Sequence, residues 1–276
     1  MKKIAAAIAK AVLYTVFFLA VQVVTAVVFS VFAGLFDEIR HAIFGVWEDS
    51  FFTKNLISLV TIFSAAVTLL LLFVFFAMRG KHLSHEVRFR KMPSAGQAML
   101  GPVCAGFGLT IPAIYLISFL PLPAAWQESY SESIGALQSG NVLLMEAATV
   151  LAAPLVEEVI FRGLVYTRMK RVMPVWVAAL LAAVIFGAVH GTLLHQIYVI
   201  PMGLILCLFL EKYNSLWAAV LMHMSFNLGG TVVGYYDVSN PVIFCVILGI
   251  GIFLTVLGFL QMKWYRDAHP AAASPS

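Results

Sequence analysis

Charged residues are scarce in this chain. Asp, Glu, Lys and Arg make up 11% of its 276 residues, whereas a soluble domain carries about 25%. Hydrophobic residues reach 62%, and the mean hydropathy is +0.97. This balance excludes an ordinary soluble globular protein and predicts a polytopic membrane protein whose main solvent is the lipid bilayer.

Cysteine is also rare, and the chain shows no sign of a cleaved leader. The three cysteines, Cys104, Cys207 and Cys245, all lie in apolar segments. An odd number in such positions is typical of small buried hydrophobic residues and does not indicate a disulfide framework. The first apolar segment is too long for a signal peptide and no A-x-A-like cleavage site follows it, so we expect it to be a retained span.

Long apolar runs are abundant. A membrane-spanning helix needs about 20 predominantly apolar residues. About eight segments meet this requirement: 11–35, 55–78, 97–120, 142–166, 174–193, 195–211, 215–235 and 241–262. The predicted fold is therefore all-α, with one transmembrane helical domain over residues 1–270. The small, polar residues 271–276 are expected to form a disordered tail.

The basic residues predict how the chain is oriented. Most of the 17 Lys and Arg residues, including those of a basic loop at 79–94, lie on one side of the membrane if the N-terminus is inside. By the positive-inside rule, both termini should be cytoplasmic. The loop should also be attracted to anionic lipids. We read the net charge of +4 as a topology signal rather than a nucleic-acid signal, and a short chain without a targeting extension fits a prokaryotic plasma membrane.

Ionisable and amide residues interrupt the fourth, fifth and seventh of these apolar segments. The patterns are Glu157-Glu158-Val159-Ile160-Phe161-Arg162, Phe186-Gly187-Ala188-Val189-His190 and His223-Met224-Ser225-Phe226-Asn227. An ionisable group inside a bilayer costs about 2.5–3.5 kcal/mol on insertion scales. We therefore expect the three helices to meet in one bundle and to use these side chains.

The two adjacent glutamates are expected to do different work. Glu158 and Arg162 are four residues apart and share a helix face, so they can neutralise each other where water is scarce. Glu157 points about 100° away and has no local partner. Pro154, three residues earlier, removes a backbone hydrogen bond and predicts a kink beside the carboxylates.

The three patterns together suit hydrolysis. A carboxylate near an imidazole can hold and deprotonate a water molecule. His223 and Asn227 share one helix face and can donate to an oxyanion, although such a pair can also form an interhelical hydrogen-bond patch. Because none of these segments places a serine or cysteine beside a base, water is the expected nucleophile.

The order Glu-Glu-x-x-x-Arg, Phe-x-x-x-His and His-x-x-x-Asn in successive apolar segments resembles the CPBP family. This family is also called the Abi or type II CAAX prenyl endopeptidase family and includes bacteriocin-processing members. All three motifs match at their defining positions, and the resemblance covers roughly residues 142–235. It implies an intramembrane endopeptidase with an eight-helix α-fold, in which Glu158 and Arg162 support the site.

The resemblance also implies roles for the remaining polar residues. Glu157 and His190 would hold the attacking water, and His223 with Asn227 would form the oxyanion hole. The implied partner is a membrane-embedded or lipidated peptide or protein, such as a prenylated C-terminal peptide or a bacteriocin leader. The lipid bilayer is the other partner, and no nucleic acid is expected.

Metal dependence has two readings. Glu157, His190 and His223 could be three ligands of a catalytic zinc with one open position. The chain lacks the H-E-x-x-H signature, and the family resemblance favours a glutamate-activated water without a metal. We therefore predict no cofactor and keep zinc as the alternative.

Two other functions compete with proteolysis. A non-catalytic family member could act by binding, as a membrane immunity or regulatory protein, although that role has no evident need for all three motifs. A transporter or proton relay could use the same carboxylates and histidines. The sequence shows no internal repeat, which counts against a transporter.

Overall fold

Helices account for all the regular secondary structure in the part of the chain that the computed structural model describes, residues 2–92, 94–236 and 240–270. The predicted tail at 271–276 lies outside the described residues. Nine of these helices lie before residue 140 or after residue 190: α1 (Lys2–Phe44), α2 (Phe51–Lys54), α3 (Leu56–Ala77), α4 (Leu83–Glu86), α5 (Ala95–Phe119), α6 (Ala124–Gln138), α11 (Leu193–Tyr213), α12 (Leu216–Gly234) and α13 (Pro241–Ala268). The others are α7 (Val142–Glu146), η1 (Ala147–Ala152), α8 (Ala153–Glu157), η2 (Glu158–Tyr166), α9 (Thr167–Met169) and α10 (Val175–Ala188), where η marks a π-helix.

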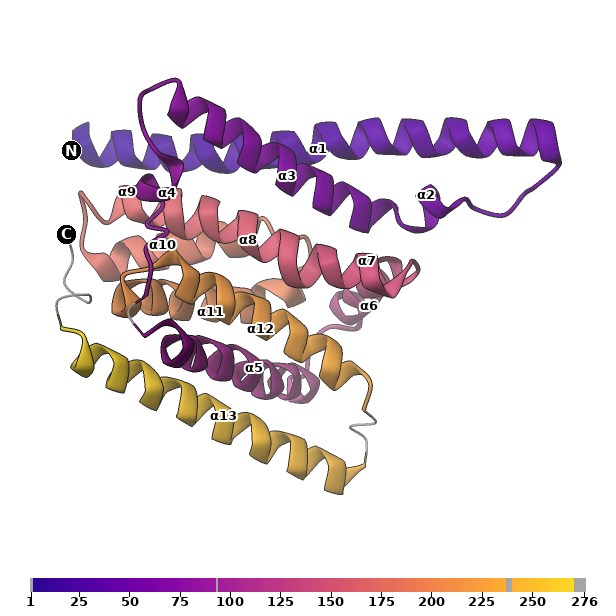
Figure 1. The fold of residues 1–276 in the computed structure, drawn as a ribbon. Helices are drawn as coiled ribbons and strands as arrows, with labels where there is room; N and C mark the ends of the chain where they lie inside the picture. The colour runs from indigo at the N-terminus through magenta and orange to yellow at the C-terminus, as the bar shows by residue number, and fades with distance from the viewer. Residues whose placement is uncertain (1, 93, 237–239, 271–276) are drawn as a thin grey trace.

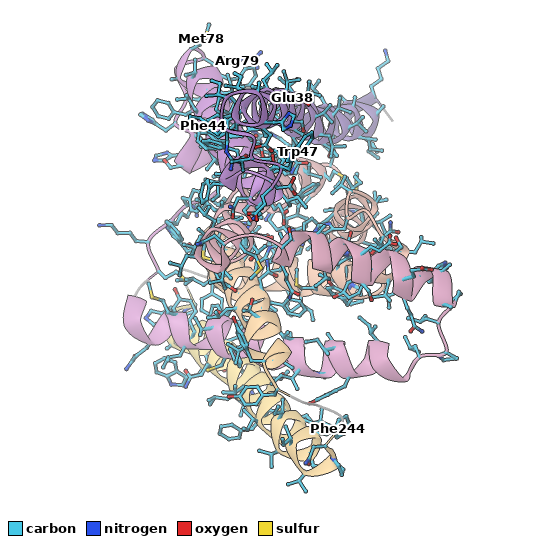
Figure 2. The ribbon with its side chains drawn as sticks, turned by 90° about the vertical axis from the view of Figure 1, so that its right-hand side faces the viewer. Glu38, Phe44, Trp47, Met78, Arg79 and Phe244 are labelled. Carbon is cyan, nitrogen blue, oxygen red and sulfur yellow. The ribbon has the colours of Figure 1, made fainter. Side chains whose placement is uncertain are left out.

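The long helices lie side by side in a layered bundle (Figure 1). α5 packs against both α12 and α13, α10 packs against α11, and α1 packs against α3 and η2. The beginning of α1 and the end of α13 lie at the same end of the bundle (Figure 1). Figure 2 shows Met78 and Arg79, which follow α3, at the opposite edge of the molecule from Phe244 on α13. The elements that carry the three motifs therefore lie between these two edges.

The predicted all-α, polytopic membrane fold is confirmed. Among the described residues, six helices are long and apolar enough to cross a bilayer: α1, α3, the 96–115 part of α5, α11, α12 and α13. The predicted fourth span is a continuous helical stretch from Val142 to Met169, and the fifth corresponds to the short apolar helix α10. The protein is thus an integral membrane protein, and the assignment of residues 1–270 to one domain stays a prediction.

The predicted fifth span, 174–193, is wrong at its end. α10 stops at Ala188, and His190 lies in a turn before α11 begins at Leu193. With 14 residues, α10 is about 21 Å long, short of the roughly 30 Å hydrocarbon core. Thr192 caps the next helix, since its hydroxyl accepts from the backbone N–H of His195 at 3.3 Å. Non-helical backbone at membrane depth is tolerated where protein buries it or it lines a cavity.

The basic loop between α3 and α5 folds back onto the protein. Arg88 is only 9% exposed and pairs with Glu211 at 2.7 Å, and Lys170 reaches the same carboxylate at 2.7 Å. Glu86 in this loop pairs with Arg168. Burial acts to raise the pKa of Glu86, but its basic neighbours outweigh burial, so its pKa lies below the ordinary value. The loop therefore ties the ends of α9 and α11 together, besides carrying positive charge.

α5 and α12 approach each other closely at Gly106. A Cβ atom at this position would lie 2.1 Å from the carbonyl oxygen of Met222. One turn along, the Thr110 hydroxyl donates to the carbonyl of Phe226 at 2.6 Å. Small residues allow membrane helices to pack backbone against backbone and to form such hydrogen bonds. This contact fixes α5 against the part of α12 that carries His223.

We expect Gly106→Leu to force α5 away from α12 and to lower the free energy of unfolding by about 3 kcal/mol, the upper range for overpacking. The Leu side chain would meet backbone, which cannot rotate away. Thermal unfolding in detergent measures the effect. Gly249→Leu on α13 is the matched control, because no atom lies within 4 Å of a Cβ there among the described residues. Equal melting temperatures for the two variants would contradict the close contact.

Candidate active site

The fourth span changes between α- and π-helical hydrogen bonding four times. It passes from α7 through the π-helix η1 into α8, and then into the π-helix η2 and α9. Pro154 lies in the first turn of α8, and Glu157 is its last residue. The disturbance expected at Pro154 thus takes the form of a change from π to α register. π-helical turns are rare and occur frequently at functional sites.

Glu158, Arg162 and His223 form a buried group. Oε1 of Glu158 accepts from Nη1 of Arg162 at 2.9 Å and from Nδ1 of His223 at 2.8 Å. The three side chains are 0%, 1% and 3% exposed. The expected ion pair between Glu158 and Arg162 is therefore present, and the structure adds His223 to it.

Glu157 faces the same imidazole from its other nitrogen. Its Oε2 lies 3.8 Å from Nε2 of His223. The expectation that Glu157 has no partner is therefore incomplete: it has none on its own helix, but α12 supplies one. Nδ1 of His223 carries a proton because it donates to Glu158, so only the protonation of Nε2 is variable. At 3.8 Å the two atoms are too far apart for a hydrogen bond, so a protonated His223 would face the Glu157 carboxylate as an ion pair.

His190 presents one nitrogen for chemistry. Its Nδ1 lies 2.7 Å from the carbonyl oxygen of Phe186. A carbonyl only accepts, so Nδ1 carries the proton, and Nε2 of the neutral ring is an acceptor. An acceptor of this kind can hold a water molecule through one of its protons. The hydrogen bond also satisfies a carbonyl at the end of α10.

Phe186 connects the groups of the site. Its ring centroid lies 4.5 Å from that of His190 and 5.9 Å from that of His223. The guanidinium carbon of Arg162 lies 4.0 Å from the same centroid, which is a cation–π contact. The first residue of the Phe-x-x-x-His pattern therefore spaces the two histidines and covers the buried cation, a role that the sequence alone did not reveal.

Asn227 lies one turn after His223 and turns its amide toward the fourth span. Its Nδ2 donates to the backbone carbonyl of Thr149 at 2.8 Å. One turn further, Thr231 donates to Glu146 at 3.4 Å. The polar residues of α12 thus contact the fourth span along several helical turns. Sequence reasoning missed Glu146 and Thr231, although a carboxylate inside an apolar segment was the signal used for the other acids.

The structure brings five of the six predicted residues to the contact between the fourth span and α12, and His190 joins them through Phe186. Their catalytic roles stay predictions. Within the described ranges, no group of three or more His, Cys, Asp or Glu side chains is arranged to hold a metal ion. Zinc binding by Glu157, His190 and His223 stays the alternative prediction.

Apolar space flanks α11 close to this contact. A cavity of about 110 Å³ lies between α5, α11 and α12, and Phe226, the residue before Asn227, lines it together with Tyr198. A wider hollow of about 450 Å³ lies beside Trp126 on α6. Both are lined by Ile197 and Pro201. Space of this kind suits apolar side chains or a hydrocarbon chain.

Comparison with known proteins agrees with the geometry. Residues 139–229 match the family described as Rce1-like, the type II CAAX prenyl endopeptidases. The family resemblance is confirmed. All six predicted site residues lie within the matched segment.

One curated relative shares part of this segment. Over 86 residues the chain is 28% identical to the protein named "Putative membrane peptidase YdiL" from Bacillus subtilis (strain 168). The alignment covers 31% of this chain and 35% of that protein, so the chain matches about a third of the relative's length. No solved structure gives a significant match. The matched family and the relative's name both describe membrane peptidases.

Proposed function

We propose that the protein is an intramembrane endopeptidase that hydrolyses peptide bonds with an activated water molecule. The observation that carries the proposal is the buried imidazole of His223 between Glu157 and Glu158, inside apolar helices. Such groups are expensive in a membrane and mark functional sites by default. The matched family segment, 139–229, supports the same conclusion.

Glu157 acts as the general base in this proposal. Its carboxylate and the acceptor nitrogen of His190 hold a water molecule, and Glu157 takes a proton as the water oxygen attacks the peptide carbonyl carbon. The carbonyl π electrons move onto oxygen and give a tetrahedral oxyanion. When this intermediate collapses, the C–N bond breaks, and the proton on Glu157 passes to the leaving amine.

His223 and Asn227 stabilise the oxyanion. His223 can donate from Nε2 only as an imidazolium, because its Nδ1 proton already serves Glu158. In that state the charges of Glu157, Glu158, Arg162 and His223 sum to zero, as a low-dielectric site requires. Arg162 then has a defined role: it holds Glu158, and Glu158 holds the imidazolium.

The proposed substrate is a membrane-embedded or lipidated peptide or protein, and the apolar cavity beside Phe226 is the place where an apolar part of it would lie. No nucleic acid and no cofactor take part. The positive-inside pattern supports cytoplasmic termini in a multi-pass protein of a prokaryotic plasma membrane. The residues that carry out hydrolysis would then all belong to one helical domain, residues 1–270.

Purified protein in proteoliposomes should cleave a prenylated C-terminal peptide or a single-span membrane peptide, and 1,10-phenanthroline should leave the rate unchanged. The reason is that the proposed site activates water with Glu157 and needs no metal. Peptide products are followed by mass spectrometry and bound zinc by elemental analysis. One zinc per chain, lost together with activity and restored with it, would recast Glu157, His190 and His223 as ligands. Folded protein that binds these peptides without cleaving them would favour a binding role instead.

A further inference from the structure

The register change at Pro154 leaves one backbone carbonyl without its helical donor. In η1, the N–H of Ala153 donates to the carbonyl of Ala148, a bond between residues five apart. The next bond in this register would run from residue 154 to the carbonyl of Thr149. Proline has no N–H, so this bond cannot form. The π-helical hydrogen bonding therefore cannot continue through Pro154, and the Thr149 carbonyl needs a donor from elsewhere.

Asn227 supplies that donor from α12. Its Nδ2 lies 2.8 Å from the Thr149 carbonyl oxygen. An unpaired backbone carbonyl inside a membrane costs several kcal/mol, so this hydrogen bond is strongly preferred over an exposed carbonyl. Pro154, five residues after Thr149, thus leaves the Thr149 carbonyl free to accept from Asn227.

The hydrogen bond also orients the carboxamide. A carbonyl accepts only, so the nitrogen end of Asn227, and not its oxygen, must face Thr149. The amide nitrogen carries two hydrogens, so one remains available when the other is donated to the Thr149 carbonyl. A carboxamide free to flip would present its oxygen to a developing negative charge, which repels it. We infer that Pro154 is a positioning residue: by lacking an N–H, it makes the Thr149 carbonyl hold Asn227 as a hydrogen-bond donor for the oxyanion.

The two proposed oxyanion donors are then held in the same way. Glu158 holds His223 through Nδ1, and Thr149 holds Asn227 through Nδ2. Both holding groups lie on the fourth span, on either side of the short helix α8, which ends with Glu157. The break in this span therefore places base and donors together. This inference rests on the proposed role of Asn227, and its test separates the two.

Pro154→Ala provides the missing N–H, which can bond to Thr149 and release Asn227. We expect kcat to fall about 10- to 100-fold, a part of the roughly 10²- to 10³-fold loss that follows removal of one oxyanion donor. KM should change less than about twofold, because the ground state does not use the donor. Pro112→Ala in α5 is the matched control, since it also introduces an N–H inside a helix and should leave the rate unchanged.

A double-mutant cycle with Asn227→Ala distinguishes positioning from general damage. Asn227→Ala should lower kcat about 10²- to 10³-fold, and adding Pro154→Ala to it should cause no further loss. If the two losses multiply, or if Pro154→Ala alone has normal kcat, the inference is wrong while the proposed function stands. Normal activity of Asn227→Ala would instead overturn the role of Asn227 itself.

A stability measurement tests the same contact without turnover. Asn227→Asp places a carboxylate oxygen against the Thr149 carbonyl, so it should lower the melting temperature. Pro154→Ala gives that carbonyl another donor and should reduce the penalty. We therefore expect Asn227→Asp to lower the melting temperature clearly less when residue 154 is alanine. An equal loss in both backgrounds would show that Pro154 does not control this contact.

Discussion

Glu157→Gln should lower the rate of peptide hydrolysis by about two to four orders of magnitude, the usual worth of general-base catalysis. The amide keeps the size and shape of the side chain and cannot take a proton from water. The loss of stability should be small, because Glu157 forms no ion pair on its own helix and its partner atom, Nε2 of His223, lies 3.8 Å away, beyond hydrogen-bond distance. Initial rates in proteoliposomes, normalised to folded protein, measure the change.

Glu38→Gln is the matched control for this variant. Glu38 is an exposed carboxylate on α1, and Figure 2 shows it near the edge of the molecule that also carries Met78 and Arg79. Its substitution should leave the rate within twofold. Near-normal turnover by Glu157→Gln would remove Glu157 from the role of base and, with it, the proposed mechanism. A variant that is inactive only because it is misfolded would show itself by a low melting temperature.

Glu158→Gln and Arg162→Met should each lower the free energy of unfolding by about 3–5 kcal/mol, because either one leaves an uncompensated buried charge. The two side chains are 0% and 1% exposed and lie 2.9 Å apart. The double variant should lose less than the sum of the two single losses, since it leaves neither charge unpaired. Thermal unfolding in detergent gives the three values, and a double-mutant cycle gives the interaction energy.

The same Arg-to-Met change in an exposed ion pair provides the comparison. Arg266 and Asp267 are 2.9 Å apart, with side chains 42% and 55% exposed. Exposed pairs contribute about 0–1 kcal/mol, so Arg266→Met should hardly move the melting temperature. Strict additivity of the Glu158 and Arg162 losses would mean that the two do not interact. Glu158→Gln also removes the negative charge that would stabilise the His223 imidazolium, so it should reduce activity as well as stability.

The sequence by itself determined the class of fold. The bilayer excludes water along the whole length of a span, so each span must be apolar over about 20 residues regardless of its neighbours. This local requirement is why α3, α12 and α13 begin close to the predicted positions. The sequence also predicted the ion pair between Glu158 and Arg162, because side chains four residues apart on a helix lie next to each other on one face.

Local rules were insufficient where the backbone departs from a regular α-helix. The apolar composition of 174–193 continues past the end of α10, so hydropathy could not locate the turn that holds His190. That turn depends on the hydrogen bond to Phe186 and on the cap that Thr192 gives to α11. Pro154 predicted a disturbance of the helix, but the sequence did not predict that the neighbouring turns would be π-helical.

Only the tertiary structure decided which groups face each other across helices. His223 binds Glu158 and approaches Glu157, and Asn227 binds the carbonyl of Thr149, although 65 and 78 residues separate the hydrogen-bonded partners. Arg88 forms an ion pair with Glu211, 123 residues later in the chain, although the sequence predicted only a positively charged loop around Arg88. Composition and spacing act within one helix, whereas these contacts depend on the rotation and depth of two helices at once, which are set by close packing such as that at Gly106.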